Sequence, residues 1–314
     1  TTEVTSLAPG ENKFTWTIRS SYCGTEDKAS VIVRNDLPTI ADAGADNTIC
    51  SDSYTLDGNE PNNGTGQWST SGSAVFNEPT QYNTEVTLAP GDNELEWTIS
   101  KGACTPSSDK VIIRNGIPTT ATTGSDRTVC SATTTLQGNT PEVGTGTWTS
   151  SDATVDNPSS PNSSVTLKPG SNTLTWTINS SSCGTSSATV DIYNNKPTVP
   201  DAGKDSTVCG SNIQLYANSP AIGNGKWSIE AAGASTTFDD ETNPAATASQ
   251  LQEGINKFKW TIQNSCGSPS DIVAIDYVPT EPNAGDDQSV CNTTSTLEAD
   301  VPTIGSGEWT IVSS

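Results

Sequence analysis

The chain has 314 residues, and its 14 Lys and Arg against 36 Asp and Glu give a formal net charge of −22. A field of this sign repels phosphate groups, which argues against nucleic acids and anionic membrane surfaces as partners. Histidine and methionine are absent, so the usual activator of a nucleophile and the commonest metal ligand are missing. No run of 18 apolar residues occurs, and we expect no membrane span. Without an initiator Met or a signal peptide, the sequence is expected to be an interior piece of a longer chain.

One stretch recurs four times and sets the organisation of the chain. In residues 167–178 a Leu-Lys-Pro-Gly segment leads to Trp176-Thr177-Ile178, and apolar residues alternate with threonines. This alternation predicts a strand with one buried face, and the Pro-Gly predicts a turn before it. The tryptophans of the four copies are 81, 79 and 84 residues apart, which indicates a repeat of about 80 residues.

The repeats divide the chain at Pro-Thr dipeptides, which form short, stiff connectors because proline restricts the backbone. Six or seven short strands per repeat, with turn signals between them and no helical periodicity, predict a small β-sandwich. The N-terminal part is predicted to begin with a strand from Glu3 to Leu7. We expect three complete units, 37–115, 116–195 and 196–278, flanked by the last strands of a unit in 1–36 and the first strands of another in 279–314.

All eight tryptophans fall in two positions of the repeat. One position precedes Thr-Ile, and the other ends a Gly-x-Gly-x-Trp motif. Period-2 placement indicates packing in the core rather than stacking on sugars. We assign one position to each sheet and expect the two tryptophans of a unit to face each other across the core. The predicted core tryptophans are Trp16, Trp68, Trp97, Trp148, Trp176, Trp227, Trp260 and Trp309.

Several motifs together resemble the PKD/Ig-like modules of giant Bacteroidota cell-surface proteins. They are Ala-Gly-x-Asp before Thr-Val-Cys (202–209), Leu-x-Gly-Asn (136–139), Gly-Thr-Gly-x-Trp, the Pro-Gly turn and the late Cys of each repeat. The resemblance covers the whole chain, and similar arrays occur in the gliding-motility adhesins exported by the type IX secretion system. Ala217-Asn218 and Ala299-Asp300 depart from the Gly-Asn pattern, so that turn is not strictly kept. The fold expected is all-β, an elongated rod of tandem Ig/PKD-like β-sandwiches.

Two functions fit this expectation. The resemblance implies the structural stalk of an extracellular adhesin or cell-surface filament, whose partners would be the neighbouring repeats, other copies in a filament, or surface polysaccharide. The alternative is a spacer or carbohydrate-binding array in a secreted polysaccharide-degrading enzyme, in which surface aromatics such as Tyr82 would bind glycans. The sequence offers no carboxylate pair, phosphate-binding loop or metal cluster above background, so we expect neither catalysis nor a cofactor.

Acidic residues near the start of the repeats are candidate calcium ligands, because carboxylates there would make a rod more rigid. The second unit has Thr122 in place of the first of these carboxylates, which leaves Asp126 alone. A simpler interpretation of Asp46, Asp126, Asp205 and Asp287 is a turn role, with each carboxylate accepting hydrogen bonds from nearby backbone N–H groups. The calcium candidates are Asp42, Asp46, Asp201, Asp205, Asp286 and Asp287.

Two cysteines recur in each repeat, and a surface location favours disulfides over free thiols or zinc. One set precedes a strand centred on a leucine, and the other follows the Trp-Thr-Ile strand. The first set is Cys50, Cys130, Cys209 and Cys291, and the second is Cys23, Cys104, Cys183 and Cys266. Three pairings fit: within each unit (Cys50–Cys104, Cys130–Cys183, Cys209–Cys266), across each linker with spacings of 25 to 27, or from one unit to the next (Cys50–Cys183, Cys130–Cys266).

The topology of the fold bears on this choice. In an Ig-like sandwich the turn before the leucine strand and the turn after the tryptophan strand lie at opposite ends. Strands of about seven residues at ~3.3 Å each separate those ends by more than ~20 Å, whereas a disulfide needs Cα atoms within roughly 7 Å. When units stack end to end, the bottom of one meets the top of the next, so we favour the unit-to-unit pairing. Pairing within a unit is the default for small secreted domains and would hold if the strand order departs from Ig.

The two ends of the chain each supply only part of a sandwich and would expose an apolar face. We favour a chain that continues beyond both ends. The alternative is that the C-terminal segment of one molecule completes the N-terminal segment of the next by strand complementation.

Overall fold

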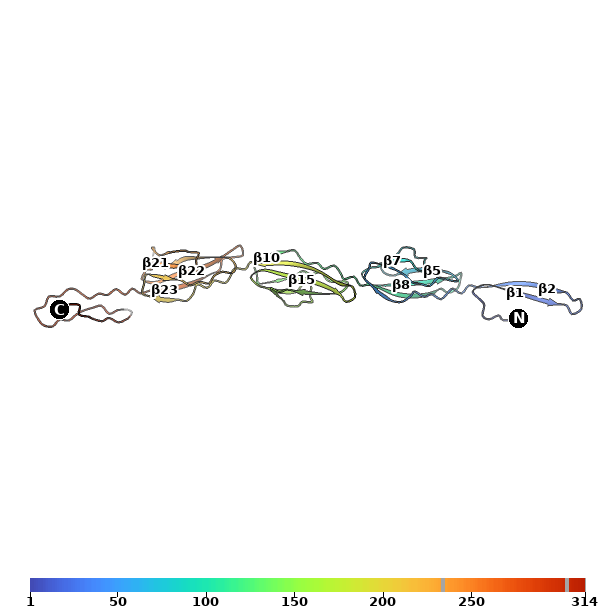
Figure 1. Ribbon diagram of the computed structural model, residues 1–314, viewed down its shortest axis with the longest axis horizontal. Coiled ribbons are helices and arrows are strands. Elements are labelled where there is room, and N and C mark those ends of the chain that lie inside the picture. Colours follow the sequence, from blue (N-terminus) through green and yellow to red (C-terminus); the bar gives the residue numbers. More distant parts are fainter. Residues whose placement is uncertain (233–234, 303–304, 314) are drawn as a thin grey trace.

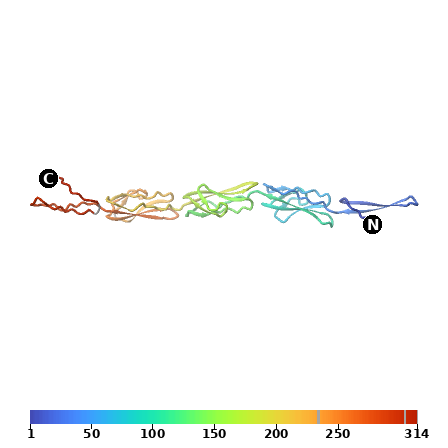
Figure 2. The same cartoon turned by 90° about the horizontal axis from the view of Figure 1, so that it is seen from below.

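The structure is a computed structural model that describes residues 1–232, 235–302 and 305–313. These residues contain 23 strands and no helix, and therefore no helical segment of membrane-spanning length. Three two-sheet units lie in a row along the long axis, with a hairpin at the N-terminal end and a segment without strands at the C-terminal end (Figure 1). A view turned by 90° shows the same extended row (Figure 2). We name the sandwiches unit 1, unit 2 and unit 3 and use the boundaries proposed from the sequence.

Unit 1 has two sheets with an immunoglobulin-like strand order. One sheet has the order β3-β9-β8-β5, with β3 parallel to β9, and the other has the order β4-β7-β6. Apart from the short edge strand β3, this is the division of an Ig domain into a C-F-G sheet and a B-E-D sheet. The strands are β3 (Asn47–Ile49), β4 (Ser53–Thr55), β5 (Thr65–Thr70), β6 (Val75–Phe76), β7 (Glu85–Thr87), β8 (Gly91–Ser100) and β9 (Ser107–Asn115).

Units 2 and 3 repeat this topology, strand for strand. Unit 2 has β10 (Arg127–Val129), β11 (Thr133–Thr135), β12 (Thr145–Thr149), β13 (Ala153–Val155), β14 (Ser164–Leu167), β15 (Gly170–Ser180) and β16 (Gly184–Asn194). Unit 3 has β17 (Ser206–Val208), β18 (Asn212–Gln214), β19 (Asn224–Ala231), β20 (Thr237–Phe238), β21 (Thr247–Ser249), β22 (Gly254–Gln263) and β23 (Ser270–Tyr277). The all-β tandem sandwich expected from the sequence is therefore present.

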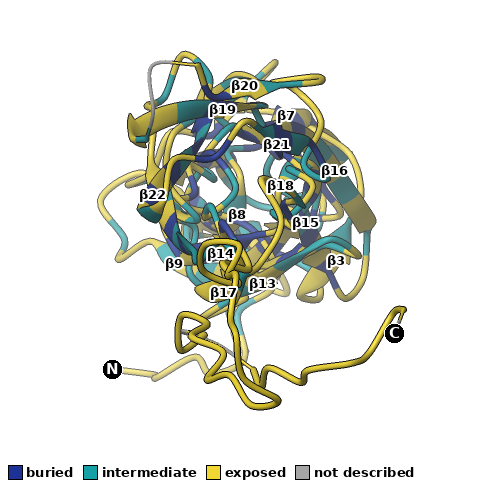
Figure 3. Ribbon diagram, turned by 90° about the vertical axis from the view of Figure 1, so that its left-hand side faces the viewer, coloured by how far each residue is buried: buried dark blue, intermediate teal, exposed yellow. Residues whose placement is uncertain are grey.

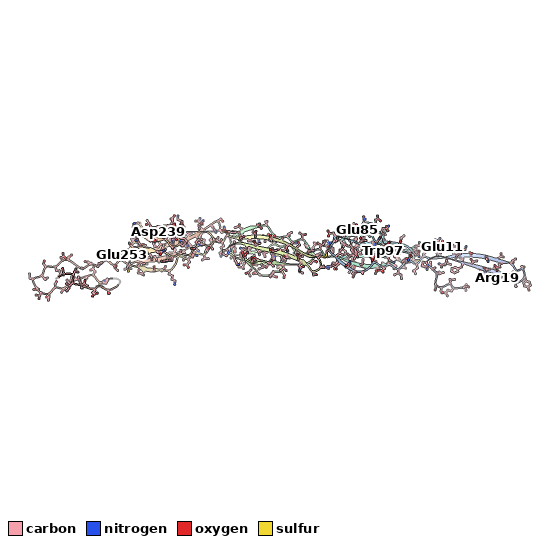
Figure 4. The ribbon with its side chains drawn as sticks, in the orientation of Figure 1. Glu11, Arg19, Glu85, Trp97, Asp239 and Glu253 are labelled. Atoms are coloured by element: carbon pink, nitrogen blue, oxygen red, sulfur yellow. A yellow bond between two sulfur atoms is a disulfide. The ribbon has the colours of Figure 1, made fainter. Side chains whose placement is uncertain are left out.

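The two tryptophans of a unit lie side by side in one sheet, so the expectation that they face each other from opposite sheets is wrong. β5 pairs directly with β8, and Trp68 stands opposite Trp97 in that antiparallel register. Their ring centroids are 5.1 Å apart. The two intervening strands, β6 and β7, belong to the other sheet, so separation in sequence gives no indication of sheet membership. Trp97 lies inside unit 1 (Figure 4).

The Gly-x-Gly-x-Trp motif makes room for this pair. A Cβ placed on Gly66 would lie 2.1 Å from the ring of Trp97, and one on Gly146 would lie 2.1 Å from the ring of Trp176. The second glycine therefore leaves the space that the indole of the neighbouring strand fills. The first glycine, Gly64 in unit 1, has a φ of +114°, a conformation that other residues rarely adopt.

The terminal segments differ from the complete units. β1 (Gly10–Arg19) and β2 (Glu26–Asn35) form a two-stranded hairpin, and residues 3–7 form no strand, contrary to the prediction. In unit 1 the matching strand, β7, pairs with β4 and β6, and the N-terminal segment has no such partners. Viewed along the rod, both terminal segments are largely exposed, whereas buried residues line the three units (Figure 3).

Six of the eight predicted core tryptophans are buried, at 2% exposure or less. The other two are exceptions: Trp16 is 70% exposed and Trp309 is 52% exposed. Both belong to terminal segments that lack the second half of a sandwich, so no opposing sheet covers them. The prediction that Trp16 and Trp309 belong to a core is therefore wrong for the described residues.

Candidate structural site at the junctions between units

Disulfides connect each complete unit to the next. Cys50 of unit 1 is bonded to Cys183 of unit 2, and Cys130 of unit 2 is bonded to Cys266 of unit 3. Each pair has a Cα–Cα distance of 5.3 Å. These are the unit-to-unit pairs, because the turn between the first two strands of one unit meets the hairpin turn of the following unit. The cysteines without a partner in the described chain are Cys23, Cys104, Cys209 and Cys291.

The first junction is packed closely around Gly116. The Gly116 N–H donates to Ile49 O of unit 1 at 2.8 Å, and its carbonyl accepts from Ser180 Oγ of unit 2 at 2.6 Å. A Cβ at this position would lie 2.8 Å from Cys183 Sγ and 3.0 Å from Ser182 Oγ. The linker and the disulfide therefore form one compact contact, in which any side chain at residue 116 would displace the bridge.

The second junction uses amide side chains where the first uses a glycine. Asn195, at the position of Gly116, donates its N–H to Val129 O at 2.8 Å. Its carbonyl accepts from Asn264 Nδ2 at 2.8 Å, and its own Nδ2 donates to Ser265 Oγ at 3.0 Å. The bonding pattern is the same in outline, since in both cases the residue after the last strand binds the preceding unit with its N–H and the following unit with its carbonyl.

The threonine of each Pro-Thr dipeptide at a junction forms hydrogen bonds with a loop of the unit that it begins. In the first junction the Thr119 hydroxyl accepts from Val143 N at 2.9 Å, and the Thr119 N–H donates to Val143 O at 3.1 Å. Thr198 makes the same pair of bonds with Ile222 in the second junction. Threonine thus ties the start of each unit to the loop that precedes its Gly-x-Gly-x-Trp strand.

At the first junction that loop also brings an apolar side chain close to the preceding unit. Val143 of unit 2 is 2% exposed, and its Cγ2 lies 4.0 Å from the position that a Cβ on Gly91 of unit 1 would occupy. Ile222 is at the same place in unit 3 and is 8% exposed, although a Cβ on Gly170, the counterpart of Gly91, would have no atom within 4 Å. In unit 1 the corresponding residue is Asn63, whose Nδ2 donates to Leu37 O at 2.8 Å and to Asn35 O of the N-terminal hairpin at 3.3 Å. Each junction therefore combines the linker, a side-chain contact and, between complete units, a disulfide.

Sequence reasoning missed a buried asparagine that holds the Pro-Gly turn. Asn172 is fully buried, and its Nδ2 lies 2.9 Å from both Lys168 O and Gly170 O and 3.4 Å from Ile192 O. Its Oδ1 accepts from Lys168 N at 2.9 Å. The sequence does carry a signal, because an Asn follows two residues after the turn glycine in all four copies: Asn12, Asn93, Asn172 and Asn256.

Four of the six proposed calcium ligands accept hydrogen bonds from backbone N–H groups. Asp42 Oδ1 accepts from Gly44 N at 3.0 Å, which is the nearby bond expected of a turn residue. Asp46 Oδ1 accepts from Ile112 N at 2.8 Å, which belongs to the paired strand β9 and not to a nearby turn. Asp126, Asp201 and Asp205 accept in the same ways from Asp191 N, Gly203 N and Ala274 N. Asp286 and Asp287 are exposed, and the described residues contain no group of three or more His, Cys, Asp or Glu side chains arranged to hold a metal.

The aromatic residue suggested as a glycan contact is also placed differently. Tyr82 is half-buried and packs against the core of unit 1, and its carbonyl accepts from Trp68 Nε1 at 3.2 Å. Exposed aromatic side chains on the complete units are Tyr193 and Tyr216, from different units. Tyr82 is thus part of the support for a core tryptophan.

Two aspartates on the surface of unit 3 have lowered pKa values. Hydrogen bonds from the Thr247 and Asp240 backbone N–H groups lower the pKa of Asp239 below its ordinary value. Hydrogen bonds from the Thr242 side chain and backbone lower the pKa of Asp240. Asp239 lies at the surface of the unit (Figure 4), where these bonds stabilise a loop.

Comparisons with known proteins add little beyond the fold. No family model and no curated protein matches the sequence. Solved structures that are similar include an I-band fragment of titin, at 13% identity with a TM-score of 0.40 over 76% of this chain and 98% of that one. The insect immune protein hemolin has 12% identity and a TM-score of 0.38 over 85% of this chain and 82% of its own. Extracellular domains 3–5 of Drosophila OTK have 11% identity and a TM-score of 0.28 over 78% and 98%. Scores this low transfer no property of those proteins to this chain.

Proposed function

We propose that this chain is a load-bearing stalk of an extracellular adhesin or cell-surface filament. The observation that carries the proposal is the pair of disulfides between units, Cys50–Cys183 and Cys130–Cys266. Two covalent connections at each junction oppose both bending and rotation about the linker. Disulfides of this kind persist in oxidising surroundings outside the cytosol, which supports an extracellular location.

The arrangement also limits how far the chain extends if its units unfold under tension. With both bridges intact, the shortest covalent path from end to end runs through residues 1–50, 183–130 and 266–314. This path holds about half of the residues, and its length at ~3.4 Å per residue is correspondingly about half that of the reduced chain. A stalk that resists overextension keeps its tip at a defined distance from the surface to which it is attached.

A more specific assignment rests on the motifs of the repeat. Their resemblance to modules of giant Bacteroidota surface proteins supports a place in an adhesin of the gliding-motility type, exported by the type IX secretion system. Repeats that stack in one dimension set the reach of such a protein, and the ligand would be bound elsewhere. The burial of the tryptophans in the three units favours this stalk role over a carbohydrate-binding array.

The experiment compares rod stiffness in matched cysteine variants of the 314-residue chain. Replacing Cys50, Cys130, Cys183 and Cys266 by Ser removes both bridges, while replacing Cys23, Cys104, Cys209 and Cys291 by Ser leaves them intact. In electron micrographs of single particles we expect straight rods for the second variant and a broad distribution of bend angles for the first. Equal bend-angle distributions for the two variants would refute the proposal.

A further inference from the structure

Unit 1 has an open cavity between its two sheets. The cavity has a volume of about 280 Å³ and is lined by residues of β3 and β9 in one sheet and of β4 in the other. Its floor is apolar, because it is formed by the core residues Leu56, Val111 and Ile113, at 2% exposure or less. Its rim carries Asp46 and Asp57, which are exposed. Small-molecule sites begin at about 300 Å³, so the cavity has room for one side chain or one small organic ion.

The two carboxylates at the rim give the opening a negative charge. Asp46 Oδ1 accepts a hydrogen bond from Ile112 N at 2.8 Å, which holds this side chain in place. Among the described residues, no Lys or Arg forms a salt bridge with Asp46 or Asp57. The chain as a whole carries a net charge of −22, which attracts cations to such an opening.

Unit 2 fills the same place with an arginine of its own. Arg127 lies 80 positions after Asn47, the interval that also separates Trp148 from Trp68. Its Nη2 donates to Thr135 O at 2.8 Å. The guanidinium therefore crosses the gap from β10 in one sheet to β11 in the other. In unit 1 the corresponding side chain is the shorter amide of Asn47, which lines the cavity.

The C-terminal segment makes the same bond with a different side chain. Gln288 lies 241 positions after Asn47, and its Nε2 donates to Thr296 O at 3.1 Å. In both copies a side-chain N–H on an apolar stem binds the carbonyl eight residues further along the chain. The chain itself thus shows which chemistry this position accepts.

A second difference keeps the cavity of unit 1 open. A Cβ on Gly124 of unit 2 would lie 2.2 Å from Oε1 of Gln137, so that side chain lies against the loop. A Cβ on the corresponding Gly44 would meet the O, C and Cβ atoms of Asp57, the nearest of them at 3.0 Å. The loop of unit 1 is therefore in contact with the backbone of residue 57, and the place taken by the amide in unit 2 is left free.

Unit 3 lacks the charge for the same ligand. Lys204 and Tyr216 stand 159 positions after Ala45 and Asp57. A lysine at the opening and the loss of one carboxylate both disfavour a cation there. Of the three complete units, unit 1 alone combines the two carboxylates with a short, uncharged side chain at the position of Asn47.

We propose that the cavity of unit 1 binds a guanidinium group on an apolar stem, the chemistry of an arginine side chain supplied from outside this chain. The guanidinium lies at the rim, where its planar set of N–H donors pairs with the carboxylates of Asp46 and Asp57. Its methylene stem contacts the apolar floor, as the stems of arginines do on protein surfaces. Tyr54 also lines the cavity, and an aromatic ring attracts a cation close to its face.

Other cations suit the cavity less well. Calcium takes six to eight oxygen ligands, whereas two carboxylates line this cavity and its floor is hydrocarbon. An ammonium ion is more strongly hydrated than a guanidinium and lacks the planar fork, so a lysine side chain should bind more weakly. The proposal concerns unit 1 alone and does not rest on the stalk function, whose test measures the shape of the rod.

The test titrates the isotope-labelled 314-residue chain with N-acetyl-L-arginine amide and follows its amide NMR signals. We expect saturable shifts confined to residues 43–47, 54–57 and 111–113 of unit 1. N-acetyl-L-citrulline amide has the same shape without the charge and should bind at least ~10-fold more weakly, a modest difference in binding free energy. A capped Gly-Arg-Gly peptide distinguishes the sources. Tighter binding than the amide indicates an arginine of a partner protein, and equal binding indicates a free guanidino compound.

Two variants test the geometry of the site. Asn47→Arg should weaken binding of the arginine probe at least ~10-fold, because the chain's own guanidinium would cross the gap as Arg127 does. Ser206→Arg is the same change in unit 3 and should leave binding unchanged. Asp57→Asn, at an exposed position, should weaken binding of the arginine probe more than that of the citrulline probe. The proposal is overturned by the absence of saturable shifts at the cavity, by equal affinity for the two probes, or by undiminished binding to Asn47→Arg.

Discussion

Unit 2 and the N-terminal hairpin contain the same strand sequence in two different surroundings. β15 and β1 have the same alternation of apolar and polar residues, the same Pro-Gly turn and the same asparagine. Trp176 is fully buried in unit 2, and Trp16 is 70% exposed in the hairpin. The local sequence therefore determines the strand and its hairpin partner, while burial depends on β10, β12 and the second sheet, which are distant along the chain. This separation of local and long-range causes can be tested by matched substitutions.

The largest difference is expected for the tryptophans. Trp176→Ala removes a fully buried indole that packs against Trp148 at a centroid distance of 5.2 Å, and should lower the free energy of unfolding of unit 2 by about 3–5 kcal/mol. Trp16→Ala at low protein concentration should change hairpin stability by less than ~0.5 kcal/mol, as for other exposed positions. Hydrogen exchange read separately for each segment measures both values. Equal losses at the two sites would contradict the comparison.

The second glycine of the Gly-x-Gly-x-Trp motif should likewise be sensitive to substitution in a complete unit and insensitive in a terminal segment. In Gly146→Ala the new Cβ would lie 2.1 Å from the Trp176 ring, and the displaced indole should cost unit 2 about 3 kcal/mol. Gly307 holds the same place in the C-terminal segment, and a Cβ added there would have no atom within 4 Å, so Gly307→Ala should be close to neutral. Denaturant unfolding followed by the fluorescence of the buried tryptophans measures the first variant against the second. A neutral Gly146→Ala would show that the glycine has no packing role.

A smaller difference is expected for the turn asparagines. Asn172→Ala leaves the carbonyls of Lys168 and Gly170 without their donor in a buried site, which should destabilise unit 2 by about 2 kcal/mol. The corresponding Asn12 lies in the partly exposed hairpin, where water replaces the lost bonds, so Asn12→Ala should cost roughly 0.5 kcal/mol. Exchange rates of the amides that follow each turn glycine report the two effects. A larger cost at Asn12 than at Asn172 would be inconsistent with burial as the cause.

The smallest effect is a pH dependence confined to unit 3. Hydrogen bonds in the folded state lower the pKa values of Asp239 and Asp240. The stability that these bonds contribute is therefore fully present at a pH above the pKa of Asp in the unfolded chain, about 3.9. It is lost as the pH falls through the lower folded values. In unit 1 the place of Asp239 is taken by Asn77, which does not titrate. We expect exchange in the loop 239–247 to accelerate below about pH 4, and the double variant D239N/D240N to lack this change.

The sequence predicts well those features that depend on local residues, and poorly those that depend on contacts between distant strands. The repeat, the strand–turn–strand pattern and the two cysteine positions are local features, and they are sufficient to predict the tandem β-sandwich. Knowledge of which ends of an Ig-like unit carry the cysteines then favours Cys50–Cys183 over Cys50–Cys104, and the structure has the former.

The errors concern contacts that only the assembled sheet determines. The sequence pattern places Trp68 and Trp97 in different sheets, because it does not reveal that the strands between them belong to the other sheet. The strand expected from Glu3 to Leu7 has a suitable sequence but no partner strands. Asn172 escapes notice because an Asn after a turn is commonly an exposed residue, and only the structure shows that it is buried against Ile192 O.

The central claim is that covalent bonds join successive units, and its most direct test is a map of the non-reduced peptides of the chain. Alkylation of free thiols, digestion without reduction and mass spectrometry identify each linked pair. We expect one linked peptide that contains Cys50 and Cys183 and another that contains Cys130 and Cys266. A map with Cys130 joined to Cys183, which closes a bridge within unit 2, or with Cys104 joined to Cys130 across the linker, would contradict the account.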